Sequence, residues 1–120
     1  MDSGIAHSCA VVSGGAVSCW GKNTAGQLGN SMTTDQSSPV AAFSFLGVQS
    51  VSCGFGHTCV VMAGSSIRCW GENTFGQLGD NSKIGQPTAS VVVSGITNAS
   101  AVLASTAFTC AFLLDKKVMC

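Results

Sequence analysis

The chain has 120 residues, a formal net charge of zero and only 8% charged residues. Its 15 glycines and two prolines, together with many Val, Ala, Ser and Thr residues, are typical of strands and turns in a globular protein of about one domain. The neutral balance, without a cluster of Lys or Arg, argues against nucleic acid or an anionic membrane as a partner. The sequence has no run of 18 or more apolar residues, so it predicts no membrane span.

A repeated motif organises the sequence. CWGKNTAGQLGN at residues 19–30 recurs as CWGENTFGQLGD at residues 69–80, and self-similarity at this spacing predicts a repeat architecture. Three cysteine pairs with equal internal spacing set the repeat boundaries. The predicted division is a partial repeat at 1–20 with a hairpin at His7–Trp20, a complete repeat or blade at 21–71, and a partial repeat at 72–120 that ends before its Trp-Gly motif.

Each cysteine pair is predicted to lie on a β-hairpin. In the second copy, β-branched-rich runs at 59–62 and 66–70 flank Ala63-Gly64-Ser65, which suits a three-residue loop with glycine near its left-handed position. This register places Cys59 opposite Cys69, and Val61 opposite Ile67. The other copies predict the same pairing, with Cys9 opposite Cys19 and Val11 opposite Val17 around 13–15, and Cys110 opposite Cys120 and Phe112 opposite Val118 around 114–116.

Two further strands are predicted in each repeat. They are Ser38–Phe45 and Val48–Cys53 on either side of Leu46-Gly47, and Thr88–Ser94 and Ala99–Ala104 on either side of residues 95–98. Four short strands form one antiparallel sheet with two apolar faces, and stacking such sheets around an axis buries both faces. The sequence therefore predicts an all-β fold of β-propeller blades, each with four antiparallel strands, and about two and a third blades in this chain.

The string Cys-Trp-Gly-x-Asn-x-x-Gly-Gln-Leu-Gly, preceded by His-Ser-Cys or His-Thr-Cys and a hairpin, resembles the repeat of the regulator-of-chromosome-condensation family. The resemblance extends from His7 to Cys120. It implies a seven-bladed β-propeller, of which this chain would be an incomplete part. The rest of the propeller is then expected in the same chain or in another copy of it.

We expect the repeated motif to be architectural. Its tryptophans provide rigid bodies that wedge between sheets, its leucines bury apolar area, its glycines permit turns with positive φ, and its Asn and Gln side chains hydrogen-bond loop backbone. The residues concerned are Trp20, Gly21, Asn23, Gly26, Gln27, Leu28 and Gly29 in the first copy, and Trp70, Gly71, Asn73, Gly76, Gln77, Leu78 and Gly79 in the second.

The six paired cysteines allow two interpretations. Directly opposed residues of an antiparallel pair come close enough for a disulfide, and three disulfides would indicate an extracellular or cell-surface protein. Alternatively, free thiols fill the blade interior and the protein is cytoplasmic or nuclear. The residues concerned are Cys9, Cys19, Cys59, Cys69, Cys110 and Cys120, which leaves Cys53 as an odd thiol.

Metal binding is a further interpretation of the same atoms. The donor types of a zinc site occur together in the second copy at Cys53, His57, Cys59 and Cys69. However, Ser3 replaces the first cysteine in the preceding copy, and Ala104 and Phe108 replace the first cysteine and the histidine in the third. No C-x-x-C motif is present either, so we predict no metal site and no cofactor.

The sequence also offers no convincing catalytic constellation. His7 and His57 occupy equivalent positions in two copies, whereas an active site is normally a single asymmetric group of residues. No two carboxylates lie close in sequence, so no acid/base couple can be named. We therefore predict that the protein is not an enzyme and that both histidines are structural.

The remaining function is that of a rigid binding surface made of loops. We predict a non-enzymatic β-propeller module that acts as a protein–protein interaction scaffold. The family resemblance implies one alternative, a guanine-nucleotide exchange factor-like regulator of a small GTPase such as Ran. The paired cysteines favour another, a disulfide-stabilised extracellular or cell-surface adhesion or structural domain. The expected partner is a protein, a small GTPase under the first alternative.

Overall fold

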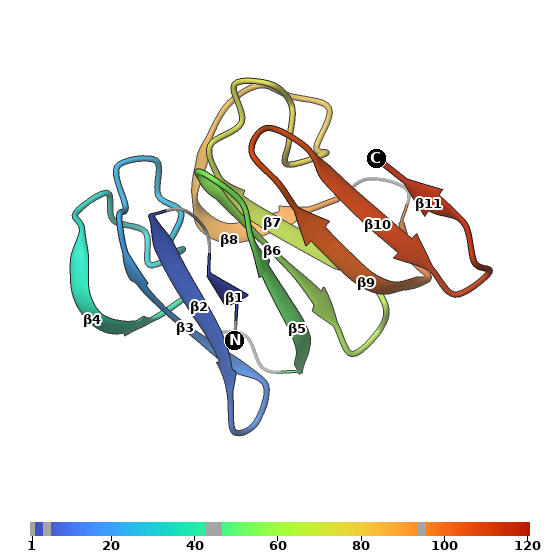
Figure 1. Cartoon of the computed structure of the whole chain (residues 1–120), viewed down its shortest axis with the longest axis horizontal. Helices are drawn as coiled ribbons and strands as arrows, with labels where there is room; N and C mark the ends of the chain where they lie inside the picture. Colours follow the sequence, from blue (N-terminus) through green and yellow to red (C-terminus); the bar gives the residue numbers. More distant parts are fainter. Residues whose placement is uncertain (1, 4–5, 43–46, 94–95) are drawn as a thin grey trace.

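Three antiparallel sheets make up the fold. The computed structural model of the chain describes residues 2–3, 6–42, 47–93 and 96–120. In these ranges the sheets lie side by side in chain order (Figure 1). No helix long and apolar enough to cross a membrane is found in this part of the chain. The prediction of an all-β fold with four-stranded antiparallel blades is confirmed.

Each sheet is a meander in which strands adjacent in sequence are paired. The first sheet contains β1 (Asp2–Ser3), β2 (His7–Val12), β3 (Ala16–Gly21) and β4 (Gln36–Ala41). The second contains β5 (Val48–Cys53), β6 (His57–Met62), β7 (Ile67–Gly71) and β8 (Gln86–Val92). The third contains β9 (Ala99–Ala104), β10 (Thr109–Leu113) and β11 (Val118–Met119).

The sheets divide the chain at other positions than the sequence repeats do. Residues 21–71, predicted as one blade, contribute to two sheets, because β4 pairs with β3. The complete second blade runs instead from Val48 to Val92, and the third sheet has three strands among the described residues. The reason is that the repeated motif begins in the last residues of the third strand and continues into the long connection to the fourth strand, at 22–35 and 72–85. The motif is thus inside a blade and does not mark its edge.

The predicted hairpin registers are confirmed. Cys9 lies opposite Cys19, Cys59 opposite Cys69, and Val61 opposite Ile67. The predicted pairs Val11 with Val17 and Phe112 with Val118 are also present.

The structure shows which residue of each hairpin loop is left-handed. In the second loop the left-handed residue is Ser65, with φ of 63°, and not the preceding Gly64. A three-residue loop places a type I turn first and the left-handed residue last. Gly15 and Lys116 occupy the same last position in the other two loops.

The outer strands begin two residues earlier than predicted. β4 starts at Gln36 and β8 at Gln86, because these residues pair with Gly21 and Gly71 beyond an irregularity in each ladder. The ends of the two predicted strands, at 43–45 and at Ser94, lie outside the described residues, as do Leu46 and Gly95. The predicted strands Val48–Cys53 and Ala99–Ala104 are confirmed.

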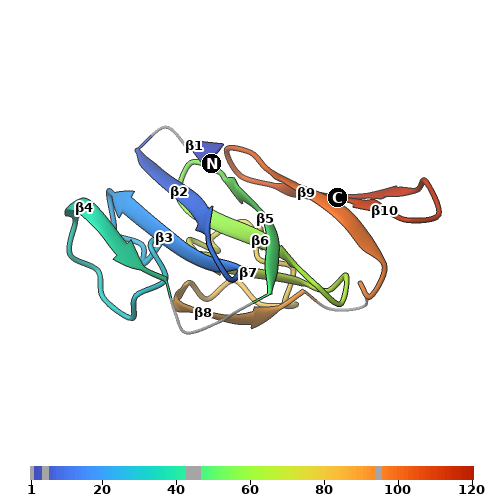
Figure 2. The same cartoon turned by 90° about the horizontal axis from the view of Figure 1, so that it is seen from below.

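Two hydrophobic cores fill the spaces between neighbouring sheets. The second sheet lies between the other two (Figure 2), so both of its faces are covered. Consecutive residues of β6 therefore enter different cores: Val60 joins the first and Val61 the second. Because side chains alternate across a strand, this double burial explains why consecutive residues of β6, at 59–62, are all apolar. We call the two interfaces the first junction and the second junction.

Candidate functional site

Each predicted cysteine pair is joined by a disulfide in the structure. Cys9–Cys19 links β2 to β3, and Cys59–Cys69 links β6 to β7, with all four side chains fully buried. The third disulfide, Cys110–Cys120, closes the last hairpin. Of the two interpretations that the sequence left open, the structure therefore supports disulfides over free thiols.

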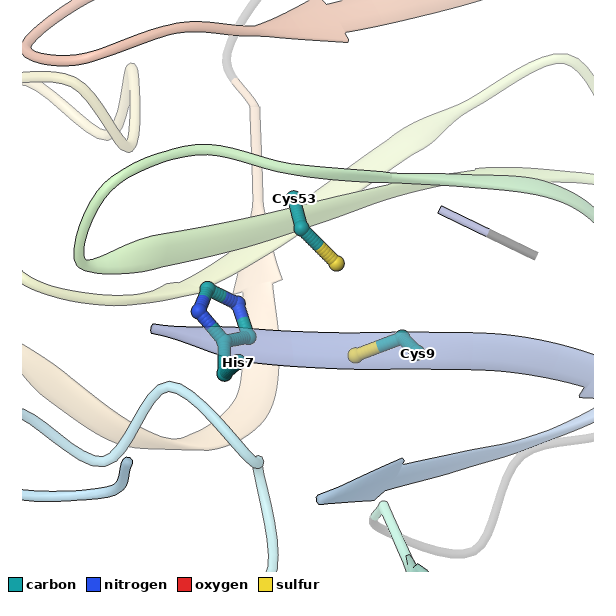
Figure 3. A group of neighbouring side chains, drawn as sticks. All are labelled: His7, Cys9 and Cys53. Atoms are coloured by element: carbon teal, nitrogen blue, oxygen red, sulfur yellow. The ribbon is translucent and has the colours of Figure 1, made fainter. Parts of the chain in front are cut away.

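The structure does not assemble the zinc set that the sequence suggested. The described residues place Cys53 next to His7 and Cys9 of the first sheet, with one ligand atom of each within 4.8 Å of the others (Figure 3). Cys9 is bonded to Cys19, which leaves only His7 and Cys53 as ligands. A structural zinc site requires four, so this group is not a zinc site in the disulfide-bonded protein.

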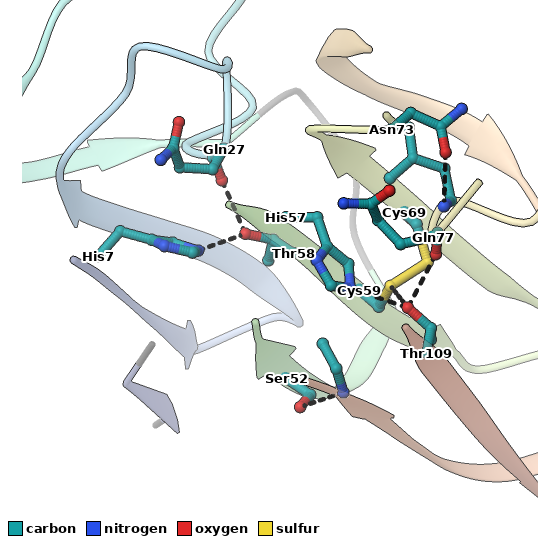
Figure 4. Close-up of a disulfide and its surroundings, with 12 residues drawn as sticks. His7, Gln27, Ser52, His57, Thr58, Cys59, Cys69, Asn73, Gln77 and Thr109 are labelled. Atoms are coloured by element: carbon teal, nitrogen blue, oxygen red, sulfur yellow. Dashed lines mark hydrogen bonds between the residues drawn. A yellow bond between two sulfur atoms is a disulfide. The ribbon is translucent and has the colours of Figure 1, made fainter. Parts of the chain in front are cut away.

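A buried chain of hydrogen bonds joins the sheets at the first junction (Figure 4). His7 Nε2 on β2 lies 2.8 Å from the Thr58 hydroxyl on β6. That hydroxyl donates to the main-chain carbonyl of Gln27 at 2.7 Å. The indole N–H of Trp70 donates to the same carbonyl at 2.9 Å. The three side chains that reach this carbonyl, directly or through Thr58, are buried.

The second junction repeats this arrangement one repeat later. His57 Nε2 lies 2.8 Å from the Thr109 hydroxyl, which donates to the main-chain carbonyl of Gln77 at 2.8 Å (Figure 4). A cavity of about 130 Å³, lined by Gln77, Leu78 and Gly79 among others, lies at this junction.

The hydrogen-bond directions fix the tautomer of His57. The hydroxyl of Thr109 has one proton and donates it to Gln77, so His57 Nε2–H must donate to Thr109. The proton of the neutral ring is therefore on Nε2. Burial lowers the pKa of His57 to about 4, and repulsion from His7 adds to this effect. His57 is neutral at pH 7 and fully buried, so it is not exposed to serve as a general base for an external substrate.

The repeated asparagines shape the motif loops. Asn73 Oδ1 accepts from the Leu78 backbone N–H at 2.9 Å, and its Nδ2 donates to the carbonyls of Ser82 and Ile84 at 3.0 and 3.1 Å. Asn23 makes the equivalent contacts in the first loop. Both asparagines are buried, so their amides replace the backbone partners that a strand would have provided.

The glutamines, leucines and glycines of the motif also lie within the fold. Gln27 and Gln77 each accept a backbone N–H two residues earlier, at 2.9 Å. A Cβ on Gly29 would lie 2.6 Å from the indole nitrogen of Trp70, so only glycine allows this approach. Positive φ angles occur at Gly21, Gly26, Gly29, Gly71, Gly76 and Gly79, and Leu28 and Leu78 are fully buried.

The motif loops also carry a surface that the sequence analysis missed. Phe75 and Ile84 in loop 72–85 are each 70% exposed, and Phe55 and Met32 are exposed in loops at the same end of the sheets. The signal was present in the alignment of the two motif copies, where Ala25 stands in the place of Phe75. We call these four apolar residues the loop-end surface.

A hollow lies beside this surface between the first and second sheets. Its volume is about 200 Å³, and its lining includes Lys22, Phe55 and Glu72. Lys22 and Glu72 are equivalent positions of the two motif copies. Residues from neighbouring blades thus line the same hollow.

The sequence matches two models described as the regulator of chromosome condensation (RCC1) repeat, one over residues 14–61 and the other over residues 48–77. Together the matches include more than half of the chain. Comparison with curated proteins gives no match.

Several solved structures have a similar fold. Yeast RCC1 (Prp20) bound to Kap60 is 17% identical with a TM-score of 0.83, and the match covers 97% of this chain and 30% of that one. Human WBSCR16 is 21% identical with a TM-score of 0.77, covering 96% and 31%. Prp20p from Saccharomyces cerevisiae, described with its binding to Gsp1p and histones, is 21% identical with a TM-score of 0.73, covering 96% and 28%. The chain thus spans less than a third of each structure, and the likeness establishes a β-propeller fold.

Replacing the buried tryptophan should destabilise the chain more than replacing the half-buried one. We expect Trp70→Ala to lower the free energy of unfolding by about 3–5 kcal/mol, because it leaves a cavity in the first junction and removes a donor from the Gln27 carbonyl. Trp20→Ala is the matched control, since Trp20 is only half-buried. Its loss should be clearly smaller in urea denaturation followed by far-ultraviolet circular dichroism, and equal losses would contradict the wedge role of Trp70.

The lowered pKa of His57 predicts a pH-dependent stability. The unfolded chain binds a proton at about 6.5 and the folded chain only at about 4, so this term is fully present above pH 6.5 and is lost as the pH falls to 4. The total loss is on the order of 3 kcal/mol. His57→Gln removes the titration and keeps an amide donor for Thr109. Urea denaturation between pH 4 and 7.5 should show a steeper decline for the unmodified chain than for this variant, and parallel curves would refute the assignment.

Proposed function

Because the chain belongs to the RCC1 repeat family, we propose that it is part of a β-propeller that acts as a non-enzymatic protein-interaction scaffold. The observation that supports this proposal is a difference in location between repeated and divergent residues. The repeated polar side chains are engaged inside the fold, whereas the loop-end surface consists of exposed apolar residues at positions where the copies differ.

The composition of this surface suits a protein partner. Aromatic residues are enriched in protein interfaces, and Phe55 and Phe75 are both exposed at this end of the sheets. Lys22 and Glu72 lie around the adjacent hollow and provide one charge of each sign. A nucleic-acid partner would instead require a positively charged surface.

A small GTPase is the specific partner class that we propose to test first. Prp20p, which has a similar fold, has been described with its binding to Gsp1p, and the family resemblance implies exchange activity toward a small GTPase. The chain spans less than a third of that structure. Regulation of nucleotide exchange is therefore a proposal about the complete propeller.

The disulfides favour a second candidate, a disulfide-stabilised extracellular or cell-surface domain, because three buried or strand-linking disulfides are unusual in a reducing compartment. Protein from its native source should distinguish the two environments. Alkylation without reduction should block one cysteine by intact mass, and alkylation after reduction should block all seven. Seven blocked cysteines in both samples would remove this candidate and leave the intracellular scaffold.

The scaffold proposal predicts that the loop end binds the partner. In the complete protein we expect Phe75→Ser to weaken binding at least about tenfold, since burying a Phe side chain stabilises by about 2 kcal/mol. Leu114→Ser is the matched control, because Leu114 is 65% exposed but lies in the hairpin loop between β10 and β11. It should leave binding unchanged.

The measurement has two parts. Quantitative affinity capture compares the partners retained by the two variants, and titration with a nucleotide-free small GTPase tests the specific class. Selective loss with Phe75→Ser supports the loop-end surface, whatever the GTPase result. Unchanged binding in this variant, or equal loss in both, would contradict the proposal.

A further inference from the structure

A third sulfur lies beside the disulfide of the first junction. Cys53, at the end of β5, is not part of a disulfide. Its sulfur lies within 4.8 Å of the Cys9 sulfur, across the space between the second and first sheets (Figure 3). Cys9 in turn is bonded to Cys19 of its own sheet. The disulfide thus lies within the first blade, and the contact between Cys53 and Cys9 crosses from the second blade to the first.

We propose that Cys53 is the nucleophile of an internal thiol–disulfide exchange that moves the disulfide from Cys9–Cys19 to Cys9–Cys53. The Cys53 thiolate attacks the Cys9 sulfur, the Cys9–Cys19 bond breaks, and the bonding electron pair leaves on the Cys19 sulfur. The proton lost by Cys53 is matched by the proton gained by Cys19. One disulfide replaces another, so the step requires neither an oxidant nor a reductant.

The surroundings favour an internal route over reaction with an outside thiol. Cys9 and Cys19 are fully buried and Cys53 is 6% exposed. A small thiol in solution therefore has little access to the disulfide, whereas Cys53 is already next to it. The contact also selects the sulfur under attack, because Cys53 meets Cys9 of β2, so Cys19 is the leaving group.

The second junction is a natural control for this chemistry. It has the equivalent disulfide, Cys59–Cys69, and the equivalent histidine, but Ala104 stands in the place of Cys53. The two positions match in the structure as well, because Cys53 pairs with Thr58 and Ala104 pairs with Thr109 in register. Among the described residues, a third cysteine therefore lies beside the disulfide at the first junction and not at the second.

The exchange changes what the disulfide holds together. Cys9–Cys19 spans a sequence separation of 10 inside one sheet, whereas Cys9–Cys53 joins the first sheet to the second. In the loop-entropy account, a disulfide that closes a longer loop restricts the unfolded chain more. The isomer would thus fasten two blades covalently and release a thiol on β3.

The exchange can be followed by locating the alkylated cysteine. Chain that has never been reduced is held at pH 4 as a reference, or incubated folded at pH 8.5 without added thiol. It is then alkylated under acidic denaturing conditions, digested and read by tandem mass spectrometry. We expect the label on Cys53 in the reference, and a growing share on Cys19 after incubation, together with a Cys9–Cys53 peptide. Below the thiol pKa, the rate should rise about tenfold per pH unit, as the thiolate fraction does.

Two variants and one dilution series make the result decisive. Ala104→Cys builds the same arrangement at the second junction and should place label on Cys69, because the introduced thiol forms a disulfide with Cys59. Cys53→Ala should carry no label under either condition. The exchange rate should not depend on protein concentration. Label that stays on Cys53, label spread over all three disulfides, or a rate that rises with concentration would each overturn the proposal.

Discussion

The packing of the first two sheets depends on the main-chain carbonyl of Gln27. It accepts hydrogen bonds from the Thr58 hydroxyl and from the Trp70 indole, both of which come from the neighbouring sheet. A carbonyl oxygen has two lone pairs, and leaving a buried one unpaired costs free energy. Asn23 fixes the loop that presents this carbonyl. The conformation of this loop and the packing of the two blades therefore depend on each other.

This constraint makes the fold an array of nearest neighbours. Each core is built from two adjacent sheets, and β6 contributes to both cores because its alternate residues face opposite sides. Stability in such an array is approximately a sum of terms within blades and between neighbours. The disulfides act within blades and the His–Thr–carbonyl chains act between them. Disulfides within the blades therefore do not compensate for lost hydrogen bonds between the blades.

The sequence predicted what depends on local spacing and missed what depends on contacts between blades. The pairing of Cys59 with Cys69 follows from a short loop and the two-residue period of strands, so it could be read directly. The neighbour of Cys53 could not, because Cys9 lies in another blade and the distance between them depends on how the sheets stack. The His7–Thr58 contact was hidden for the same reason, although its near repetition at His57–Thr109 carried a signal at the repeat period.

The blade boundary was missed for a related reason. A repeated motif fixes the period of an array but not its phase, and only the pairing of β4 with β3 shows where each blade ends. The same logic bears on function. Residues that recur in both copies are the ones that make the junctions, so they supply little that distinguishes one blade from another. Specificity has to come from positions where the copies diverge, such as Lys22 and Glu72 or Ala25 and Phe75. These positions lie on the motif loops of adjacent blades, so the same loops that hold the blades together from within present their differences outward.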